Sequence, residues 1–208
     1  MKAVVFDRDG VLASFDRRRA ANRLEPLLPF SLAELESRLR RWHQASPGNV
    51  DLWPRFVRYL ARDRTLPEFD VEALRKVDPL TFLVAHNDAH MALTAVRARG
   101  VMTAVLSNFG LLDLDASLVA LKLADLIDIA RSAEQLGVAK PDPRAYLAIA
   151  KALTVEPSDC LFLDDRDDCV AGARAVGMDA IRIDRSGETP GAWTSLAPLI
   201  EISGEMVC

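Results

Sequence analysis

The sequence predicts an α/β fold in which a doubly wound parallel sheet carries an inserted helical segment. Two observations predict it. From about residue 86 onward, short apolar runs alternate with helical patterns, which is typical of a parallel sheet with right-handed crossovers. Residues 14–83 lack this alternation and predict consecutive helices with short breaks. The sheet is therefore expected to begin near the amino terminus, to be interrupted by helices, and to resume near residue 86.

The first predicted strand, residues 2–6, is apolar and β-branched, and Asp7, Arg8 and Asp9 follow it. Side chains alternate along extended backbone, so Asp7 and Asp9 are expected on one side and Arg8 on the other. Carboxylates at the carboxyl end of a strand lie where open α/β sheets bind ligands. Two like charges this close need a bound cation or a shared proton. Magnesium beside a nucleophilic carboxylate is the chemistry of phosphoryl transfer through an aspartyl-phosphate, although acidic loops after strands also occur without it.

The inserted segment contains three helical patterns. Ser31 and Glu34 form a capping-box pattern, which predicts a helix reaching about residue 42. Apolar residues at helical spacing predict two more helices, one with Leu52, Phe56, Val57 and Leu60, and a shorter one with Val71, Leu74 and Val77.

The remaining elements follow in alternation. Gly100 and Gly177 are expected helix ends, and Pro143 lies in the first turn of a helix. The tail from residue 186 is polar and turn-rich and predicts no element. The predicted helices are residues 91–99, 111–123, 143–153 and 170–176, and the predicted strands are residues 101–106, 126–130, 160–163 and 180–183.

The composition excludes several classes of protein. A chain of 208 residues with 50% hydrophobic residues is expected to form one globular domain with a modest insertion. A net charge of −4 without a basic stripe predicts no nucleic-acid partner. Three widely spaced cysteines without a CxxC pattern predict a reducing, cytoplasmic setting. A secretion leader and a membrane-spanning apolar run are both missing from the sequence, so we expect no membrane partner.

Three later groups of polar residues stand after strands or in loops of the same sheet. Ser107 and Asn108 follow the strand at residues 101–106, where a hydroxyl and a loop amide can hold phosphate oxygens or form an ordinary turn. Lys140 precedes a proline turn and is suited to a phosphate, although most lysines are simply solvated. Asp164 and Asp165 follow the strand at residues 160–163. Carboxylates there suit magnesium, or alternatively the first turn of the next helix.

Taken in order, these groups resemble the motifs of the haloacid dehalogenase superfamily, whose members are mostly magnesium-dependent phosphatases. The resemblance covers residues 1–15 and 86–184. It implies a Rossmann-like core made of residues 1–13 and 84–208, and a helical cap, residues 14–83, over the active site. The four matching segments are Phe6-Asp7-Arg8-Asp9-Gly10-Val11, Leu106-Ser107-Asn108, Gly137-Val138-Ala139-Lys140-Pro141 and Leu163-Asp164-Asp165.

The resemblance implies catalytic roles for the first motif. Asp7 would be the nucleophile and a metal ligand. Asp9 would protonate the leaving alkoxide and then activate water, and its backbone carbonyl would reach the metal. The expected activity is hydrolysis of a small phosphorylated metabolite, with Mg²⁺ as the cofactor.

The resemblance implies binding roles for the other motifs. Ser107 and the amide of Asn108 would hold the phosphoryl oxygens. Lys140 would pair with Asp7 and with the phosphate. Asp165 would be the remaining direct metal ligand, and Asp164 a direct or an indirect one.

Two other functions are compatible with these motifs. One is a phosphomutase of the same fold, and another is a catalytically weak module that binds a phosphorylated ligand. The nucleophile and Asp9 together argue against the weak module, and Asp9 also argues against the dehalogenase branch. Arg8 stands where many relatives carry an apolar residue, and we expect it to face away from the metal in a salt bridge. His86 and His90 have a spacing that can bind zinc, but no third ligand is evident.

Overall fold

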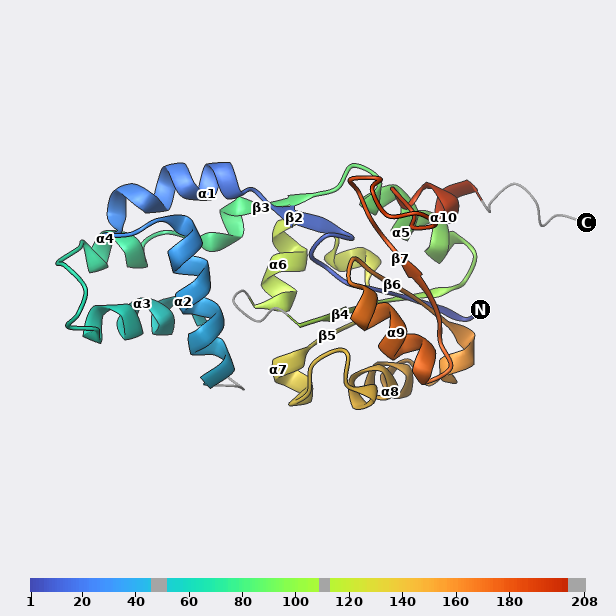
Figure 1. Cartoon of the computed structure of the whole chain (residues 1–208). Helices are drawn as coiled ribbons and strands as arrows, with labels where there is room; N and C mark the ends of the chain where they lie inside the picture. Colours follow the sequence, from blue (N-terminus) through green and yellow to red (C-terminus); the bar gives the residue numbers. More distant parts are fainter. Residues whose placement is uncertain (46–51, 109–112, 202–208) are drawn as a thin grey trace, which may run out of the picture.

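A five-stranded parallel sheet forms the centre of the larger part of the molecule (Figure 1). The structure is a computed structural model that describes residues 1–45, 52–108 and 113–201. β1 is the middle strand, with β4 and β6 directly beside it, so the predicted parallel α/β fold is confirmed. The order is β5-β4-β1-β6-β7, in which the strands are β1 (Ala3–Phe6), β4 (Met102–Ser107), β5 (Ile129–Ser132), β6 (Cys160–Asp164) and β7 (Asp179–Arg182).

Helices cover both faces of this sheet, because its strands are apolar on both sides. In β1, Val4 and Phe6 pack into one hydrophobic cluster, and Ala3 and Val5 pack into the other. All four side chains are fully buried, as expected for a parallel sheet enclosed between helices. One face is covered by α5 (Ala89–Ala98), α6 (Leu114–Ala120) and α10 (Ala197–Glu201), and the other by α8 (Pro143–Leu153) and α9 (Asp167–Ala175).

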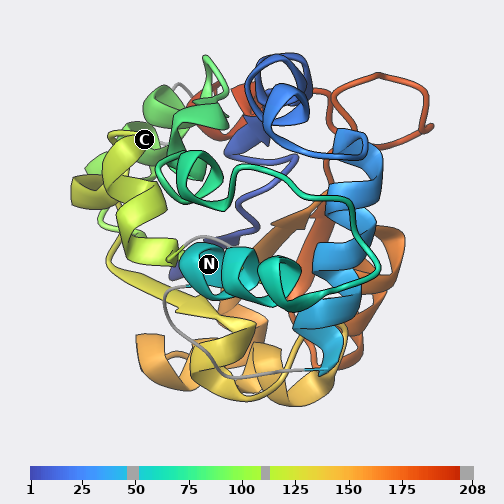
Figure 2. The same ribbon diagram turned by 90° about the vertical axis from the view of Figure 1, so that its left-hand side faces the viewer.

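The inserted segment forms a helical part within residues 16–82 that has its own hydrophobic core. It lies beside the sheet in Figure 1 and in front of it in Figure 2. Phe56, Val57 and Leu60 are fully buried in that core, as their helical spacing predicted. Its helices are α1 (Arg17–Leu24), α2 (Leu32–Ala45), α3 (Leu52–Arg62) and α4 (Val71–Arg75). Shorter helical turns complete the chain: η1 (Glu25–Leu27), η2 (Pro79–Phe82), η3 (Ala124–Leu126), α7 (Ala133–Leu136) and η4 (Pro157–Asp159).

A two-stranded antiparallel ribbon connects the helical part to the core (Figure 1). It consists of β2 (Ala13–Phe15) and β3 (Leu83–Ala85). Phe15 pairs with Leu83 across the ribbon, and its ring meets that of Phe82 edge-on at 5.7 Å. The chain therefore leaves and re-enters the core through neighbouring strands.

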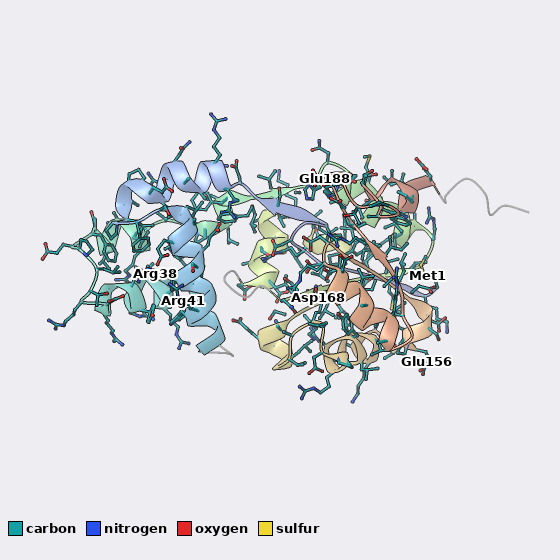
Figure 3. The ribbon with its side chains drawn as sticks, viewed as in Figure 1. Met1, Arg38, Arg41, Glu156, Asp168 and Glu188 are labelled. Carbon is teal, nitrogen blue, oxygen red and sulfur yellow. The ribbon has the colours of Figure 1, made fainter. Side chains whose placement is uncertain are left out.

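The carboxyl ends of the sheet strands point toward the helical part (Figure 3). Met1, which precedes β1, and Glu156, which precedes β6, lie on the side of the core away from it. Asp168, near the start of α9, lies on the side nearest to it, and Arg38 and Arg41 mark α2 across from the core. The predicted site residues that end β1, β4 and β6 thus face the inserted helices.

Several element boundaries differ from the sequence prediction. The ribbon strands were not predicted, because three residues are too short to show a period. α9 begins at Asp167 instead of residue 170. Asp167 and Asp168 occupy its first turn, where the helix dipole favours acidic side chains. They add nothing to the apolar periodicity from which the helix was predicted. β5 begins three residues later than predicted, and α6 is shorter. Residues 111–112 of the predicted helix 111–123 lie outside the described residues.

The tail, for which the sequence predicted no element, is held to the core in part by the carboxylate of Asp88. Asp88 accepts two hydrogen bonds from the Arg185 guanidinium, at 3.0 and 3.1 Å, and one from the Leu196 backbone N–H at 2.7 Å. Arg185 also donates to the Val11 carbonyl. Leu196 and Leu199 are fully buried against the sheet. The tail therefore completes one face of the core.

Gly172 in α9 gives a stability prediction. A Cβ at this position would lie 2.8 Å from the Pro141 carbonyl oxygen and 2.9 Å from the Tyr146 hydroxyl. Gly172→Ala should therefore lower the free energy of unfolding by about 1–3 kcal/mol through overpacking, although alanine is the better helix former by ~1 kcal/mol. Urea denaturation measures the change. Ala171→Gly, on the exposed side of the same helix, is the control and should cost ~1 kcal/mol. A stabilised Gly172→Ala variant would contradict the packing argument.

Candidate active site

The buried ammonium of Lys140 joins two carboxylates at the carboxyl edge of the sheet. Lys140 Nζ donates to Asp7 Oδ1 at 2.8 Å and to Asp164 Oδ2 at 2.7 Å. All three residues are buried, and Asp164 is fully so. Asp7 follows β1 and Asp164 ends β6, and the Asp7 backbone N–H donates to the Leu163 carbonyl at 2.8 Å. The predicted pair of Lys140 and Asp7 is therefore present in the structure.

The side chain of Asn108 fixes the backbone of Lys140. Its amide nitrogen donates to the Lys140 carbonyl, and its amide oxygen accepts from the Lys140 N–H, both at 2.7 Å. These two hydrogen bonds connect the end of β4 to the loop that contains Lys140, which we call the lysine loop. The sequence prediction concerned only the backbone amide of Asn108. Nothing in the sequence pattern indicated the side-chain contact, because it joins two loops far apart in the chain.

The charges of the site do not balance within the protein. Burial lowers the pKa of Lys140, but the carboxylates of Asp7 and Asp164 outweigh it, so its pKa is raised and the ammonium is retained. Burial raises the pKa of Asp7 to about 7; Lys140 opposes this effect, while Asp164 and Asp9 add to it. Burial and then Asp164 also raise the pKa of Asp165. One ammonium thus faces several carboxylates, and a bound cation would stabilise their ionised forms.

Three carboxylates can hold that cation. Oxygen atoms of Asp7, Asp164 and Asp165 all lie within 4.8 Å of one another, and hard divalent cations prefer such ligands. Gly10 makes room for this arrangement, because a Cβ on it would lie 2.5 Å from Asp165 Oδ2. Its φ of +79° also favours glycine. The structure thus brings both Asp164 and Asp165 to the cluster, whereas the Asp9 side chain is not one of its members.

Arg8 is fully buried and holds the carboxylate of Asp9. Its Nε and Nη2 atoms donate to the two oxygens of Asp9 at 3.2 and 2.8 Å, and Nη1 donates to the Ser117 hydroxyl at 3.1 Å. The Asp9 side chain is 36% exposed. Arg8 therefore forms a salt bridge, as the sequence predicted. Its expected position on the side opposite Asp9 is wrong: the two side chains meet on the cleft, because the strand ends at Phe6 and the alternation does not continue. The sequence did not indicate that its partner would be the adjacent predicted acid.

A cleft of about 480 Å³ brings the predicted site residues together. Ser107 is buried at the end of β4 and lies on its wall. Arg17 and Leu35 of the helical part lie on the same cleft, so it extends across to the inserted helices. His86 and His90 do not line it, and among the described residues neither belongs to a potential metal-binding group. The predicted residues on the cleft are Asp7, Asp9, Ser107, Asn108, Lys140, Asp164 and Asp165.

A family model described as haloacid dehalogenase-like hydrolase matches residues 1–177. The chain belongs to the haloacid dehalogenase-like hydrolases. It is therefore an enzyme, and the Rossmann-like fold that the motifs implied is confirmed. None of the helices in the part of the chain that the structure describes has the length and apolar character needed to cross a bilayer.

The proteins similar to this chain include phosphatases and haloacid dehalogenases. A phosphatase from Mycobacterium tuberculosis (strain CDC 1551 / Oshkosh) is 42% identical over 195 residues, which are 91% of this chain and 90% of the relative. An (S)-2-haloacid dehalogenase from Burkholderia cepacia is 35% identical over 108 residues, 52% of this chain and 47% of the relative. Among solved structures, a dehalogenase with an intermediate complex has a TM-score of 0.71 at 27% identity, covering 97% of this chain and 96% of that chain.

The buried Arg8 gives a stability prediction. Arg8→Ala should lower the free energy of unfolding by about 2–4 kcal/mol, because it leaves a cavity and removes the partner of Asp9. Arg8→Met should recover about half of that loss, since its side chain fills much of the same volume. Urea denaturation of the two variants measures the difference. Equal free energies of unfolding for Arg8→Ala and Arg8→Met would show that the packing of the Arg8 side chain does not contribute to stability.

The raised pKa of Asp7 predicts how stability depends on pH when no metal is bound. Between about pH 4 and pH 7 the folded protein keeps a proton on Asp7 that the unfolded chain releases, so stability falls as pH rises through this window. Asp7→Asn should remove this part of the slope and be more stable than the wild type at pH 8. Denaturant titrations in EDTA at pH 5, 6, 7 and 8 measure it, and identical slopes would contradict it.

Proposed function

We propose that this enzyme is a magnesium-dependent phosphomonoester hydrolase that acts through an aspartyl-phosphate. The observation that carries the proposal is the buried triad of Asp7, Lys140 and Asp164 beside Asp165. A carboxylate at this place can attack phosphorus only if the charge of the incoming phosphate is compensated. Lys140 and a cation on the carboxylate cluster provide that compensation.

The proposed reaction has two steps. In the first, an oxygen of Asp7 attacks phosphorus, the bond from phosphorus to the ester oxygen breaks, and Asp9 gives its proton to the departing alkoxide. In the second, water attacks the phosphorus of the aspartyl-phosphate, Asp9 takes a proton from that water, and the bond to Asp7 breaks to release phosphate. The reaction as a whole consumes one water and returns the enzyme to its starting state.

Other residues on the cleft would bind and orient the substrate. Ser107 and the amide of Asn108 would hold phosphoryl oxygens beside Lys140. Arg8 occupies one acceptor position on each Asp9 oxygen, and each oxygen keeps a second lone pair that can carry the proton. The Asp9 side chain is 36% exposed and lines the cleft, so its proton would be within reach of a leaving group there.

Magnesium fits the carboxylate cluster as the resident cation. Asp7, Asp164 and Asp165 would hold it together with the backbone carbonyl of Asp9, and it would supply Lewis-acid stabilisation of the phosphoryl oxygens. Residues 14–83 would act as a cap that excludes water and selects the leaving group. Cys160 and Cys169 are free and buried, which supports a cytoplasmic setting.

Haloacid dehalogenation is the competing activity, since several relatives carry that name. The same carboxylate would then attack a carbon atom bearing a halogen. Asp9 supports the phosphatase instead, because a dehalogenase has no leaving alkoxide to protonate. The relative with 42% identity over 91% of this chain is likewise named a phosphatase.

The nucleophile gives the first activity prediction. With Mg²⁺, the wild type should release phosphate from a panel of phosphomonoesters, and Asp7→Asn should lower kcat by about 10³-fold or more. Asp179→Asn, at the exposed start of β7 away from the cleft, should match the wild type. Phosphate release and halide release from 2-chloropropionate are measured in parallel. Halide release without phosphate release would overturn the proposal in favour of dehalogenation.

The carboxylate cluster gives a prediction for metal binding alone. Mg²⁺ at about 100 times its Kd should stabilise the EDTA-treated protein by about 2.7 kcal/mol, which raises Tm by roughly 5–10 °C for a chain of this size. Asp165→Asn should lose most of this shift, whereas Asp179→Asn should keep it. Thermal denaturation with and without Mg²⁺ measures it. An undiminished shift in Asp165→Asn would place the ion elsewhere.

A further inference from the structure

The two walls of the cleft differ in chemistry. The core wall carries the carboxylates and Lys140, whereas the wall formed by the inserted segment is mostly apolar. Phe15 and Leu83 of the connecting ribbon lie at its near end and are only partly buried. Beyond them the apolar wall continues through Leu32, Leu35 and Leu39 of α2 and Trp53 of α3. We refer to these six residues as the apolar wall.

The cations that line the described part of the cleft already have anionic partners. On the core side, Arg8 pairs with Asp9, Lys140 with Asp7 and Asp164, and Arg166 with Asp168. On the helical side, Arg17 pairs with Glu36 at 2.9 Å. These two side chains are the charged members of the helical wall within the described residues, and their charges cancel. A second anionic group on a substrate would therefore meet no uncompensated cation there.

Polar neutral groups are equally scarce on this side of the cleft. Within the described residues, the ribbon and the helices contribute two neutral side chains that can form hydrogen bonds, Ser14 and Trp53. The Trp53 indole N–H already donates to the Leu74 carbonyl at 3.3 Å. A sugar or polyol would lose its hydrogen bonds to water on entering and would recover few of them. An apolar group instead gains from leaving water. The wall thus selects against hydroxyl-rich substrates as well as against doubly anionic ones.

We infer that the substrate is a phosphomonoester whose organic part is uncharged and apolar, such as an arylalkyl or branched alkyl phosphate. The inference rests on the proposed function and names the substrate class of the same site. The phosphoryl group lies at Asp7 and Lys140, and the organic part extends along the apolar wall toward Trp53. The cleft is continuous from the carboxylates to this wall, so one molecule spans both regions.

The test compares phosphate esters of primary alcohols, so that leaving-group reactivity is matched. The substrates are 2-phenylethyl phosphate, glycerol 1-phosphate, glucose 6-phosphate and phosphoglycolate, each with Mg²⁺. We expect kcat/KM for 2-phenylethyl phosphate to exceed that for each of the others by about 10- to 100-fold, the range that a few apolar contacts provide. A preference for glycerol 1-phosphate, glucose 6-phosphate or phosphoglycolate would overturn the inference and leave the phosphatase proposal intact. No release from any ester would refute both.

Neighbouring residues of β3 provide matched variants. Leu83 lines the cleft, whereas Val84 is 45% exposed and does not. Leu83→Asn should lower the ratio of kcat/KM for 2-phenylethyl phosphate over glycerol 1-phosphate by about 10-fold, and Val84→Asn should leave it unchanged. Because both substrates are measured on one preparation, partial unfolding cancels from the ratio. An unchanged ratio in Leu83→Asn would contradict the role of the apolar wall.

A third variant tests whether Arg17 leaves Glu36 to bind an anionic substrate. Arg17→Gln should change kcat/KM for 2-phenylethyl phosphate by no more than about 2-fold, because the inferred substrate does not contact the Arg17 charge. A selective loss of phosphoglycolate turnover in this variant, together with a wild-type preference for that ester, would establish an anion-selective cleft and overturn the inference.

Discussion

The ion pairs of Lys140 with Asp7 and Asp164 organise the whole carboxyl edge of the sheet. They join the ends of β1 and β6 to the lysine loop, and Asn108 adds the end of β4. Buried charges are costly unless they are paired and hydrogen-bonded. Each partner is therefore held in place by the need to satisfy the others, and the carboxylates proposed to hold a metal take positions that the lysine helps to define.

The sheet topology explains why residues so distant in the chain meet at one edge. β1 occupies the middle, with β4 and β6 on either side, so three neighbouring strand ends deliver Asp7, Ser107 and Asp164 to one place. Parallel strands all end on the same side, and the crossover helices cover the faces. The apolar strands form a buried, rigid sheet, and the polar residues at their carboxyl ends form the candidate site.

Much of this arrangement could be predicted from the sequence, because strand ends and motif order are local patterns. The parallel sheet, the inserted helices and the pairing of Lys140 with Asp7 were all predicted. The hydrogen bonds between the Asn108 side chain and the Lys140 backbone were not predicted, and neither were the partners of Arg8. Periodicity does not indicate which group a buried donor will bind. The β2–β3 ribbon and α10 were too short for any periodic signal, and the tail depends on a distant carboxylate, Asp88.

The β2–β3 ribbon has an evolutionary consequence. The chain enters and leaves the helical part through two neighbouring strands, which are paired through three residues each. A different insert could be grafted onto the same two strands without displacing the carboxylates, the lysine or the sheet behind them. Under the proposed function, selectivity and reactivity would lie on separable segments of one gene, and a lineage could exchange its choice of substrate while keeping its chemistry.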